Sequence, residues 1–376
     1  MARPRTAARP RTVYQGANRP NWILTLVIAL LVGTLLAGLW LFYDLQQHLI
    51  YDKDGVRLAA PGTELAARAS AGGGTGRREL SPVDAEIVVD KTDYSAITGT
   101  DAAGLTTPLH ARFVPARDVT AATLNGFTAS SSGAGSYNAL ALELKDESGM
   151  LAWRSAAPLA ESYGVNGEFE MSDYIARLKE TGVWLIAQLC CLTDGSMAAR
   201  NPPMALRAAA NDGLYVSPEG RAWLDPYNAA TREYFAALVT ELAGMGFDEI
   251  LLTGLYLPED GTYRFGGEMT ETPDGASAVS SFALYLRALA DELGIRLSGM
   301  AERASLEERA EDAAPPGQDL SVFFKAFDRV AFPADYGYTV GLAAIENALG
   351  SGGAAGTRIV PVVTGHTPEH ESYIVK

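Results

Sequence analysis

Residues 137–149 read YNALALELKDESG, an apolar run of β-strand character that ends in a cluster of charged residues. Glu143, Lys145 and Glu147 alternate along this run, so they share one face if the strand continues. Asp146 points to the other face or lies on the turn that follows. A strand that is apolar in its middle and carboxylate-rich at its C-terminal end is typical of an α/β barrel, because such barrels carry their sites at that end of the strands.

Strand-like apolar runs and amphipathic helical segments alternate along the rest of the chain, with glycines such as Gly182, Gly246 and Gly294 directly after helices. This alternation predicts a parallel sheet covered by helices. Seven strands over roughly 260 residues favour a (β/α)8 TIM-like barrel over an open doubly wound sheet, and no strand is followed by G-x-G-x-x-G. The expected strands are 109–116, 138–145, 183–192, 248–257, 295–301, 327–333 and 358–365, and the expected helices are 171–181, 229–245, 280–293 and 340–349.

The eighth strand of the barrel is the open question of this fold. After Gly365 only HTPEHESYIVK remains, which is too short for another helix and strand. The eighth strand is therefore formed by residues 372–375 without a preceding helix, supplied by AEIVVD at 85–90, or absent, which would leave the barrel incomplete at its C-terminus.

A single transmembrane helix is expected before the barrel. Residues 22–43 form an uncharged apolar run of 22 residues, and at about 1.5 Å per residue such a helix crosses a bilayer core of about 30 Å. Trp22, Trp40 and Tyr43 mark its ends as interfacial anchors do. A cleaved signal peptide is the alternative, but its apolar core would be shorter and WLFYDLQQHL offers no small-residue cleavage site.

The charges that flank this run predict the orientation of the chain. Residues 1–21 carry five arginines and no acid, so they form a cytoplasmic basic tail and the rest lies outside the cell membrane. Residues 44–82 are rich in Gly, Ala and Ser and are expected to form a flexible stalk. Residues 83–376 then form the extracytoplasmic barrel domain.

The composition excludes nucleic acid as a partner. The chain has 376 residues, 48% of them hydrophobic, and a net charge of −15, so a large core is available. Beyond the basic tail, 25 basic residues face 45 acidic ones, whereas phosphate binding needs an excess of positive charge.

No metal or cofactor is expected. Cys190 and Cys191 are adjacent in an apolar run, so we expect two buried thiols rather than a strained vicinal disulfide, and they cannot build a zinc site alone. His366 and His370, with Glu369 between them, have the spacing of a helical metal site, but Pro368 argues against a helix there.

Several residues at expected strand ends are candidates for a site. Asp146 and Glu147 follow one strand, although Asp146 is equally suited to capping the turn. Glu143 and Lys145 could form an inward ion pair. Asp194 ends the next strand, either as a site residue or as part of an Asp-Gly turn.

Further candidates come from later loops. Asp225 lies in WLDPY between Trp223 and Tyr227, where it sets a turn, faces the cleft, or does both. Aromatic rings beside carboxylates suit the faces of sugars, although these two rings could equally lie in the core. Glu302 follows a strand, as a cleft acid or as the start of a charged helix. The other candidates are Asp335 and Tyr336, which could border the cleft, and Asp248 and Glu249, which begin a strand and are expected to be structural at the bottom of the barrel.

Four stretches in order resemble the motifs of a bacterial glycoside hydrolase family, whose members are uncharacterised TIM-barrel domains related to the alpha-amylase-like hydrolases. They are YNALALELKDESG, ARNPPMAL, WLDPY and GFDEILLTGLYLP. In the family the corresponding motifs resemble NAVVIDVKDDSG, D-P-x-L-A-x-x-N-P, W-x-D-P-Y and GFDEIQFDYVRFP. The resemblance covers about residues 109–365 and implies a TIM barrel that acts on glycans without a cofactor, with Asp146 and Glu147 in the place of the family's acidic pair.

This chain departs from the family where chemistry is expected. Thr253 stands where the family's FDYVRFP has an acid, and Tyr256 stands where it has an arginine. Glycosidases need two carboxyl groups, one kept protonated as acid and one ionised as nucleophile or base. The loss at Thr253 therefore removes one expected member of the pair, and Glu302 is the best substitute.

Three functions remain open from the sequence. The first is a membrane-anchored, extracytoplasmic glycoside hydrolase acting on a cell-wall or capsular polysaccharide, with Asp146 or Glu147, Asp225 and Glu302 as catalytic candidates. Trp223, Tyr227, Tyr256, Asp194, Asp335 and Tyr336 are the candidates for binding substrate. The alternative is a catalytically degenerate barrel that binds envelope glycan or a partner protein, and a structural barrel within an envelope assembly is a third.

Overall fold

The computed structural model describes residues 49–52, 55–58, 105, 107–129, 137–266, 275–306, 317–334, 342–343, 345, 355–365, 368 and 370–376. The chain divides into two compact units, Met1–Ser81 and Pro82–Lys376. In the first unit β1 (Leu49–Asp52) and β2 (Gly55–Leu58) pair antiparallel. This pair lies within the stretch predicted to be a stalk, whose other residues are outside the described ranges.

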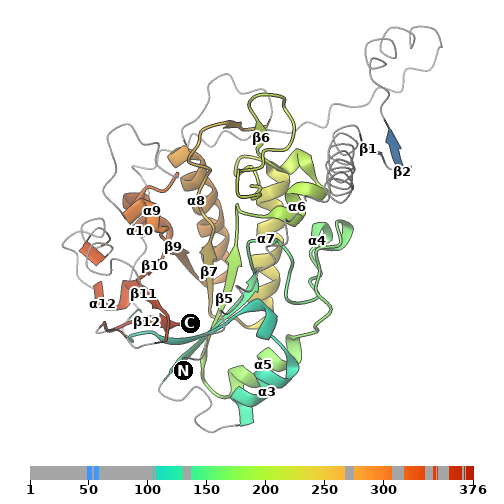
Figure 1. Cartoon of the computed structure of the whole chain (residues 1–376). Helices are drawn as coiled ribbons and strands as arrows, with labels where there is room; N and C mark the ends of the chain where they lie inside the picture. Colours follow the sequence, from blue (N-terminus) through green and yellow to red (C-terminus); the bar gives the residue numbers. More distant parts are fainter. Residues whose placement is uncertain are drawn as a thin grey trace, which may run out of the picture. The chain divides into compact units, whose positions relative to one another are not determined.

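The second unit is a closed barrel of eight parallel strands (Figure 1). The last strand, β12, pairs with β11 on one side and with β3 on the other, so it closes the barrel. The predicted (β/α)8 barrel is confirmed, and its eighth strand comes from the C-terminal segment rather than being absent. The strands are β3 (His110–Val114), β4 (Ala139–Lys145), β5 (Trp184–Cys190), β7 (Glu249–Thr253), β9 (Arg296–Met300), β10 (Arg329–Pro333), β11 (Ile359–Val363) and β12 (Tyr373–Val375).

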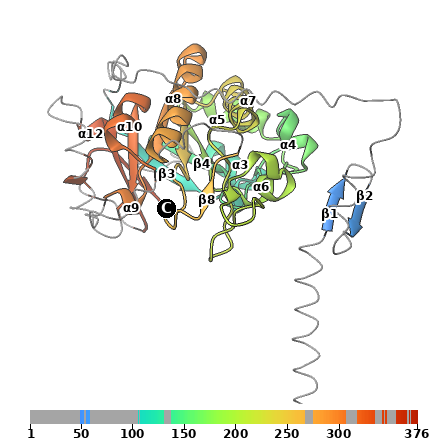
Figure 2. The ribbon, with the colours of Figure 1, turned by 90° about the horizontal axis from the view of Figure 1, so that it is seen from above.

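Helices cover the outside of the strands, and α7 and α8 lie side by side there (Figures 1 and 2). Most predicted helices are present, but α8 begins five residues earlier than expected, and residues 340–349 lie mostly outside the described ranges. The α-helices are α3 (Ala121–Ala129), α4 (Pro158–Ser162), α5 (Ser172–Glu180), α6 (Gly195–Arg200), α7 (Ala229–Met245), α8 (Gly275–Leu293), α9 (Arg303–Leu306), α10 (Leu320–Ala326) and α12 (Ala355–Arg358). Short elements complete the unit: 3-10 helices η2 (Ala116–Asp118) and η3 (Pro202–Met204), and the antiparallel pair β6 (Arg207–Ala208) and β8 (Tyr263–Arg264).

The ends of α7 show how local residues set helix boundaries. The Asn228 side chain accepts a hydrogen bond from the Thr231 amide at 3.2 Å, which caps the first turn. Gly246 ends the helix with φ of 100°, a left-handed conformation that favours glycine. In α5, Met171 occupies the N-cap position and makes no side-chain cap, and Ser172 is already helical.

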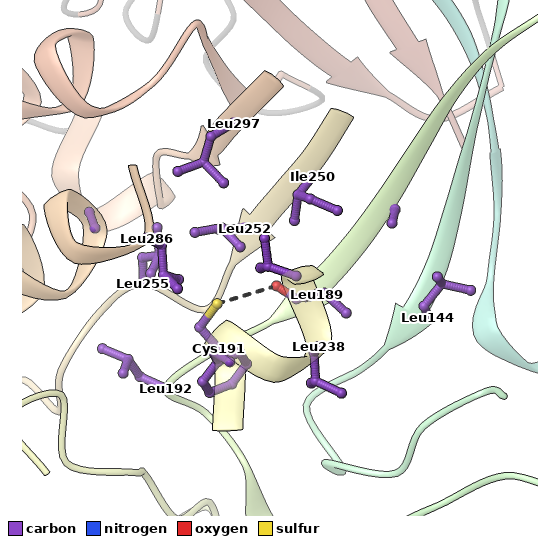
Figure 3. Close-up of a cluster of buried hydrophobic side chains, with 14 of the residues drawn as sticks. Leu144, Leu189, Cys191, Leu192, Leu238, Ile250, Leu252, Leu255, Leu286 and Leu297 are labelled. Atoms are coloured by element: carbon purple, nitrogen blue, oxygen red, sulfur yellow. Dashed lines mark hydrogen bonds between the residues drawn. The ribbon is translucent and has the colours of Figure 1, made fainter. Parts of the chain in front are cut away.

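Two apolar layers result from the alternation of side chains along the strands. On β5, Leu185, Leu189 and the adjoining Cys191 pack outward against the helices, whereas Ile186 points into the barrel. Figure 3 shows Cys191 among leucines of the outer layer, with its thiol donating to the Leu189 carbonyl at 3.6 Å. Cys190 and Cys191 are both free and buried, as predicted.

A bulge in β4 overturns the expectation that Glu143 and Lys145 share a face. The register with β5 shifts between these two residues, and a bulge turns the following side chain to the other side of the strand. The Lys145 ammonium therefore lies over the Phe235 ring of α7, 5.4 Å from its centroid. Glu143 accepts hydrogen bonds from the Ala116 amide at 3.0 Å and from Gln188 at 3.3 Å, so the predicted inward ion pair is absent.

No helix among the described residues is long and apolar enough to cross a membrane. The predicted span at 22–43 lies outside those residues, and so does the strand expected at 85–90.

Candidate active site

The mouth of the barrel, at the C-terminal ends of its strands, brings together Glu302 and Glu147. Glu302 lies two residues after the end of β9 and is half-buried. Its amide donates to the Gln318 side chain at 2.8 Å, and Gln318 in turn donates to the Leu255 carbonyl at 2.9 Å. The Glu302 carboxylate accepts a hydrogen bond from the Gly254 amide. Glu302 thus belongs to the mouth, although it immediately precedes α9.

The Glu302 carboxyl group keeps its proton up to near-neutral pH. Burial raises its pKa to about 7, and the neighbouring charge of Glu147 adds to the rise. The Gly254 amide and the charges of Lys376 and Arg221 act in the opposite direction without cancelling it. A carboxyl group that keeps its proton near pH 7 can serve as a general acid.

Glu147 is exposed on the turn that follows β4. Asp146 builds that turn, because its carboxylate accepts hydrogen bonds from the Ser148 amide at 2.9 Å and the Ser148 hydroxyl at 2.5 Å. The turn is fixed to α6 by the Ser196 amide, which donates to the Ser148 carbonyl at 2.9 Å. Of the two acids predicted here, Asp146 caps the turn and Glu147 is the one near Glu302.

Asp194 is fully buried in an ion pair with Lys145, 2.9 Å away. Its other oxygen caps α6 by accepting from the Met197 amide at 2.7 Å, and Lys145 also donates to the Cys190 carbonyl at 2.7 Å. Burial disfavours the Lys145 ammonium, but Asp194 outweighs that effect and the pKa of Lys145 is raised. Asp194 is therefore occupied in holding β4 and α6 together beneath the mouth.

Asp225 is also buried and ties two loops together. Its oxygens accept from the Tyr227 amide at 2.8 Å and the Gly266 amide at 2.7 Å. Burial raises its pKa to about 6, while these hydrogen bonds and the charge of Arg232 act against the rise. The Tyr227 ring packs edge-on against Phe265 with centroids 5.2 Å apart. Asp225 sets the turn, as one of the options from the sequence has it, and Tyr227 is a core aromatic.

An aromatic pocket of about 370 Å³ is lined by residues of the loops after β6 and after β7. Trp223 and Tyr256 both line it, and their rings meet edge-on with centroids 6.0 Å apart. The Tyr256 hydroxyl accepts from Arg221 at 2.9 Å. Arg221 and Tyr256 both interact electrostatically with Glu302. The aromatic pocket therefore adjoins the mouth.

Thr253 ends β7 and is half-buried where the family motif has an acid. The next residue, Gly254, has φ of 62°, and a Cβ there would lie 2.5 Å from the Cys190 sulfur. A glycine is therefore required for the amide that binds Glu302. Glu302, from the neighbouring strand, supplies a carboxyl group beside the position that lost one.

The sequence pointed to some of these residues and missed others. Arg221, Gly254, Tyr215 and Lys376 were not singled out, and only the proximity of Arg221 to WLDPY could have drawn attention to it. Asp335, Tyr336, His366 and Glu369 lie outside the described residues. Among the described residues, no three His, Cys, Asp or Glu side chains are grouped as a metal ion would require.

The structure places this chain among (β/α)8-barrel proteins, with two carboxyl groups at the mouth of the barrel. The amino-acid sequence identifies the family. The family described as "Putative glycosyl hydrolase domain" matches residues 125–344, which is more than half of the chain. The chain belongs to this family, and the resemblance inferred from the four motifs is confirmed. No curated protein matches the chain.

Solved structures with similar folds share little sequence with this chain. A hypothetical protein from Ruminiclostridium thermocellum is 21% identical over 50% of this chain and 95% of its own, with a TM-score of 0.43. The catalytic domain of beta-amylase from Paenibacillus polymyxa is 11% identical over 72% and 92%, with a TM-score of 0.45. The spore cortex-lytic enzyme SleL from Bacillus cereus is 10% identical over 69% and 50%, with a TM-score of 0.39.

Proposed function

We propose that this chain is a membrane-anchored glycoside hydrolase that acts outside the cytoplasm on a cell-wall or capsular polysaccharide. Membership of the glycosyl hydrolase family supports hydrolysis of a glycan. The observation that carries the proposal is the Glu302 carboxyl group, whose pKa is about 7 and which adjoins Glu147 at the barrel mouth.

Glu302 is the general acid in this proposal and Glu147 is the second carboxylate. The reaction needs one carboxyl group to protonate the leaving oxygen and another, ionised, to act as nucleophile or to activate water. The half-buried Glu302 is suited to hold the proton, which leaves Glu147 as the second carboxylate. Asp146, Asp194 and Asp225 are each bound to backbone amides, so we assign them to holding the loops of the mouth.

The anchor rests on the sequence. The apolar run at 22–43, with the arginine-rich residues 1–21 on its N-terminal side, supports one membrane-spanning helix with the N-terminus in the cytoplasm. Residues 44–82 then link it to the extracytoplasmic domain of residues 83–376. Recovery of the full-length chain in the soluble fraction without detergent would contradict this part of the proposal.

The alternative is a barrel that binds glycan or a partner protein without cleaving it. One observation favours it: Thr253 stands at the end of β7, where the family motif has an acid. If Glu302 does not replace that acid, the mouth lacks one of the two carboxyl groups that hydrolysis requires.

The test is the release of reducing ends from purified wall polysaccharides by the full-length protein in detergent. Glu302→Gln and Glu147→Gln should each reduce the rate by about 10²–10⁴-fold, as expected for loss of a general acid or its partner carboxylate. The control is Glu168→Gln, an exposed acid on the loop after α4, which should leave the rate unchanged.

The parent rate should also fall as pH rises through about 7, because Glu302 then loses the proton that it must donate. Full activity of Glu302→Gln would refute the assignment. Glycan binding without release by the parent would favour the binding alternative.

A further inference from the structure

Gln318 is a buried polar side chain with no part in the candidate catalytic pair. It lies between Gly317 and Asp319, just before α10, and is 7% exposed. Gly317 has φ of 80° and approaches α8 so closely that a Cβ there would lie 2.9 Å from the Gly275 carbonyl oxygen. Asp319 caps α10 by accepting a hydrogen bond from the Ser321 amide at 2.9 Å. The backbone is therefore fixed on both sides of Gln318, by α8 and by α10.

The Gln318 side chain makes every hydrogen bond that a primary amide can make. Its oxygen accepts from the Glu302 amide at 2.8 Å and from the Ser305 hydroxyl at 2.7 Å. Its nitrogen donates to the Leu255 carbonyl at 2.9 Å and to the Met300 carbonyl at 3.1 Å. An amide has two donor hydrogens and two acceptor positions, so all of them are used. The partners also fix its orientation, because exchanging oxygen and nitrogen would set donors against donors.

These hydrogen bonds join the two loops that hold Glu302. Met300 ends β9 and Glu302 follows it. Leu255 lies after β7 and directly follows Gly254, whose amide binds the Glu302 carboxylate. Gln318 thus holds Glu302 by its backbone and holds the Gly254 loop by the next residue. Its side chain therefore sets how closely the carboxylate and the Gly254 amide approach each other.

Loss of the Gln318 amide would leave several buried groups of these loops without a partner. An unsatisfied buried donor or acceptor costs about 1–3 kcal/mol, so we expect the two loops to separate until water reaches these groups. Glu302 would then gain contact with water as well. The half-buried position of Glu302 depends on Gln318 for this reason.

We propose that Gln318 is a positioning residue for the general acid: its amide holds the loops after β7 and β9 together and so keeps Glu302 in its half-buried place at the mouth. Gln318 acts through Glu302 and not by contact with the glycan. The role in catalysis rests on the proposed function, whereas the placement of Glu302 can be measured without turnover.

The titration of Glu302 shows whether the residue is held in place. Burial is the largest reason why its pKa is raised to about 7, so release into water should lower the pKa. The other groups that interact electrostatically with Glu302 are the same in parent and variants. They are Glu147 after β4, Cys190 on β5, Arg221 after β6, Tyr256 after β7 and Lys376 after β12.

The experiment is a carbon-13 NMR titration of the glutamate carboxyl groups in the full-length protein in detergent. The Glu302 signal is the one that Glu302→Gln removes. In the parent its midpoint should lie near pH 7. Gln318→Met keeps the length of the side chain but makes none of the four hydrogen bonds. The midpoint should therefore fall by at least about one pH unit, towards the value near 4.3 of an unperturbed glutamate.

Asn138→Ala is the matched control. Asn138 also joins two segments through its amide, but at the bottom of the barrel, just before β4. It accepts from the His110 amide at 2.8 Å and donates to the Pro108 carbonyl at 2.8 Å. This variant should lose stability without moving the Glu302 midpoint.

A second variant covers the case in which Gln318→Met does not fold. Gln318→Glu keeps a carboxyl oxygen that can accept from the Glu302 amide and the Ser305 hydroxyl. The Glu302 midpoint should then stay at or above that of the parent, since a neighbouring carboxyl group can only raise it. An unchanged near-ultraviolet circular dichroism spectrum shows that the fold is retained.

Three results would contradict the positioning role. They are a midpoint that Gln318→Met leaves in place or raises, an equal fall in Asn138→Ala, and a fall in Gln318→Glu.

Kinetics separate this role from the proposed function. For a parent that releases glycan, Gln318→Met should lower kcat about 10–100-fold and change KM less than about threefold, since it misplaces the acid without touching substrate. A rise in KM with kcat unchanged would mean that Gln318 acts on the substrate instead. A lowered midpoint in a protein that releases no glycan would retain the positioning of Glu302 and reject the hydrolase. Release by the parent with an unmoved midpoint in Gln318→Met would do the reverse.

Discussion

Two glutamates at opposite ends of the barrel have opposite surroundings. Glu249 begins β7 at the bottom, and Glu302 follows the neighbouring strand β9 at the mouth. Glu249 is 1% exposed and accepts hydrogen bonds from Ser298, from Arg329 and, at 2.9 Å, from Trp184. Glu302 forms no ion pair with a described residue and has the like charge of Glu147 beside it.

Burial alone therefore does not identify a functional carboxylate. Glu249 is the more buried of the two, yet its charge is matched by Arg329 and its oxygens by two further donors, which is the pattern of a structural group. Glu302 is less buried, but its charge is poorly compensated, so burial raises its pKa to about 7. The carboxyl group with the unmatched charge is the one available for chemistry.

The largest effect is expected from removing the cation at the bottom of the barrel. Arg329→Met leaves Glu249 buried without its counter-charge and should lower the free energy of unfolding by about 3–5 kcal/mol. Urea denaturation followed by tryptophan fluorescence measures this change.

Arg117→Met is the matched control, because its side chain is 84% exposed and the same substitution there should cost less than about 0.5 kcal/mol. Equal effects at the two positions would mean that the Glu249–Arg329 pair does not stabilise the barrel. Glu249 would then be no better compensated than Glu302.

A second prediction concerns the turn that presents Glu147 at the mouth. Gly149 has φ of 84°, and a Cβ there would lie 1.8 Å from an Asp194 oxygen. Gly149→Ala should therefore lower the free energy of unfolding by about 2–4 kcal/mol, because the new methyl group displaces the buried Lys145–Asp194 pair and an alanine also strains the backbone at this φ. Gly182→Ala is the control for the backbone strain alone, because Gly182 has φ of 77° with open space around it.

Only the backbone strain, about 1–2 kcal/mol, should remain at Gly182. Chemical denaturation of the two variants side by side is the measurement. If Gly149→Ala is no worse than Gly182→Ala, then Asp194 does not brace the Glu147 turn as its contacts indicate.

Local pattern made the barrel predictable and left much of the site unpredictable. Strand and helix periods are readable from neighbouring residues, and the strand limits expected for β4 and β5 lie within three residues of those observed. The direction of Lys145 depends on a bulge, which no residue type in 139–145 marks. Its partner, Asp194, comes from the next strand–helix junction.

The roles of the other acids depend on residues far away in the chain. Asp225 is bound by Gly266, 41 positions later, and this contact turns a plausible cleft acid into a loop tie. Glu302 precedes a helix, and contacts with Gln318, with the Gly254 amide and with the turn that carries Glu147 define its position at the mouth. Sequence could list the strand-end carboxylates, but their partners, which separate structural from functional acids, are set by the closed barrel.

The smallest predicted effect tests the unmatched charge of Glu302 directly, through stability against pH. Its pKa is about 7 in the folded chain and about 4.3 when unfolded, so the folded state binds its proton more tightly. The stability from this group is complete below about pH 4.3 and is lost as pH rises through 7. Glu302→Gln should match the parent near pH 4.5 and exceed it by about 1–3 kcal/mol at pH 8, where the parent holds an unmatched carboxylate. Urea denaturation of both proteins at the two pH values measures the difference. If the variant and the parent are equally stable at both pH values, or the variant is the less stable one at pH 8, then Glu302 is as well compensated as Glu249. The two ends of the barrel would then no longer differ in this respect.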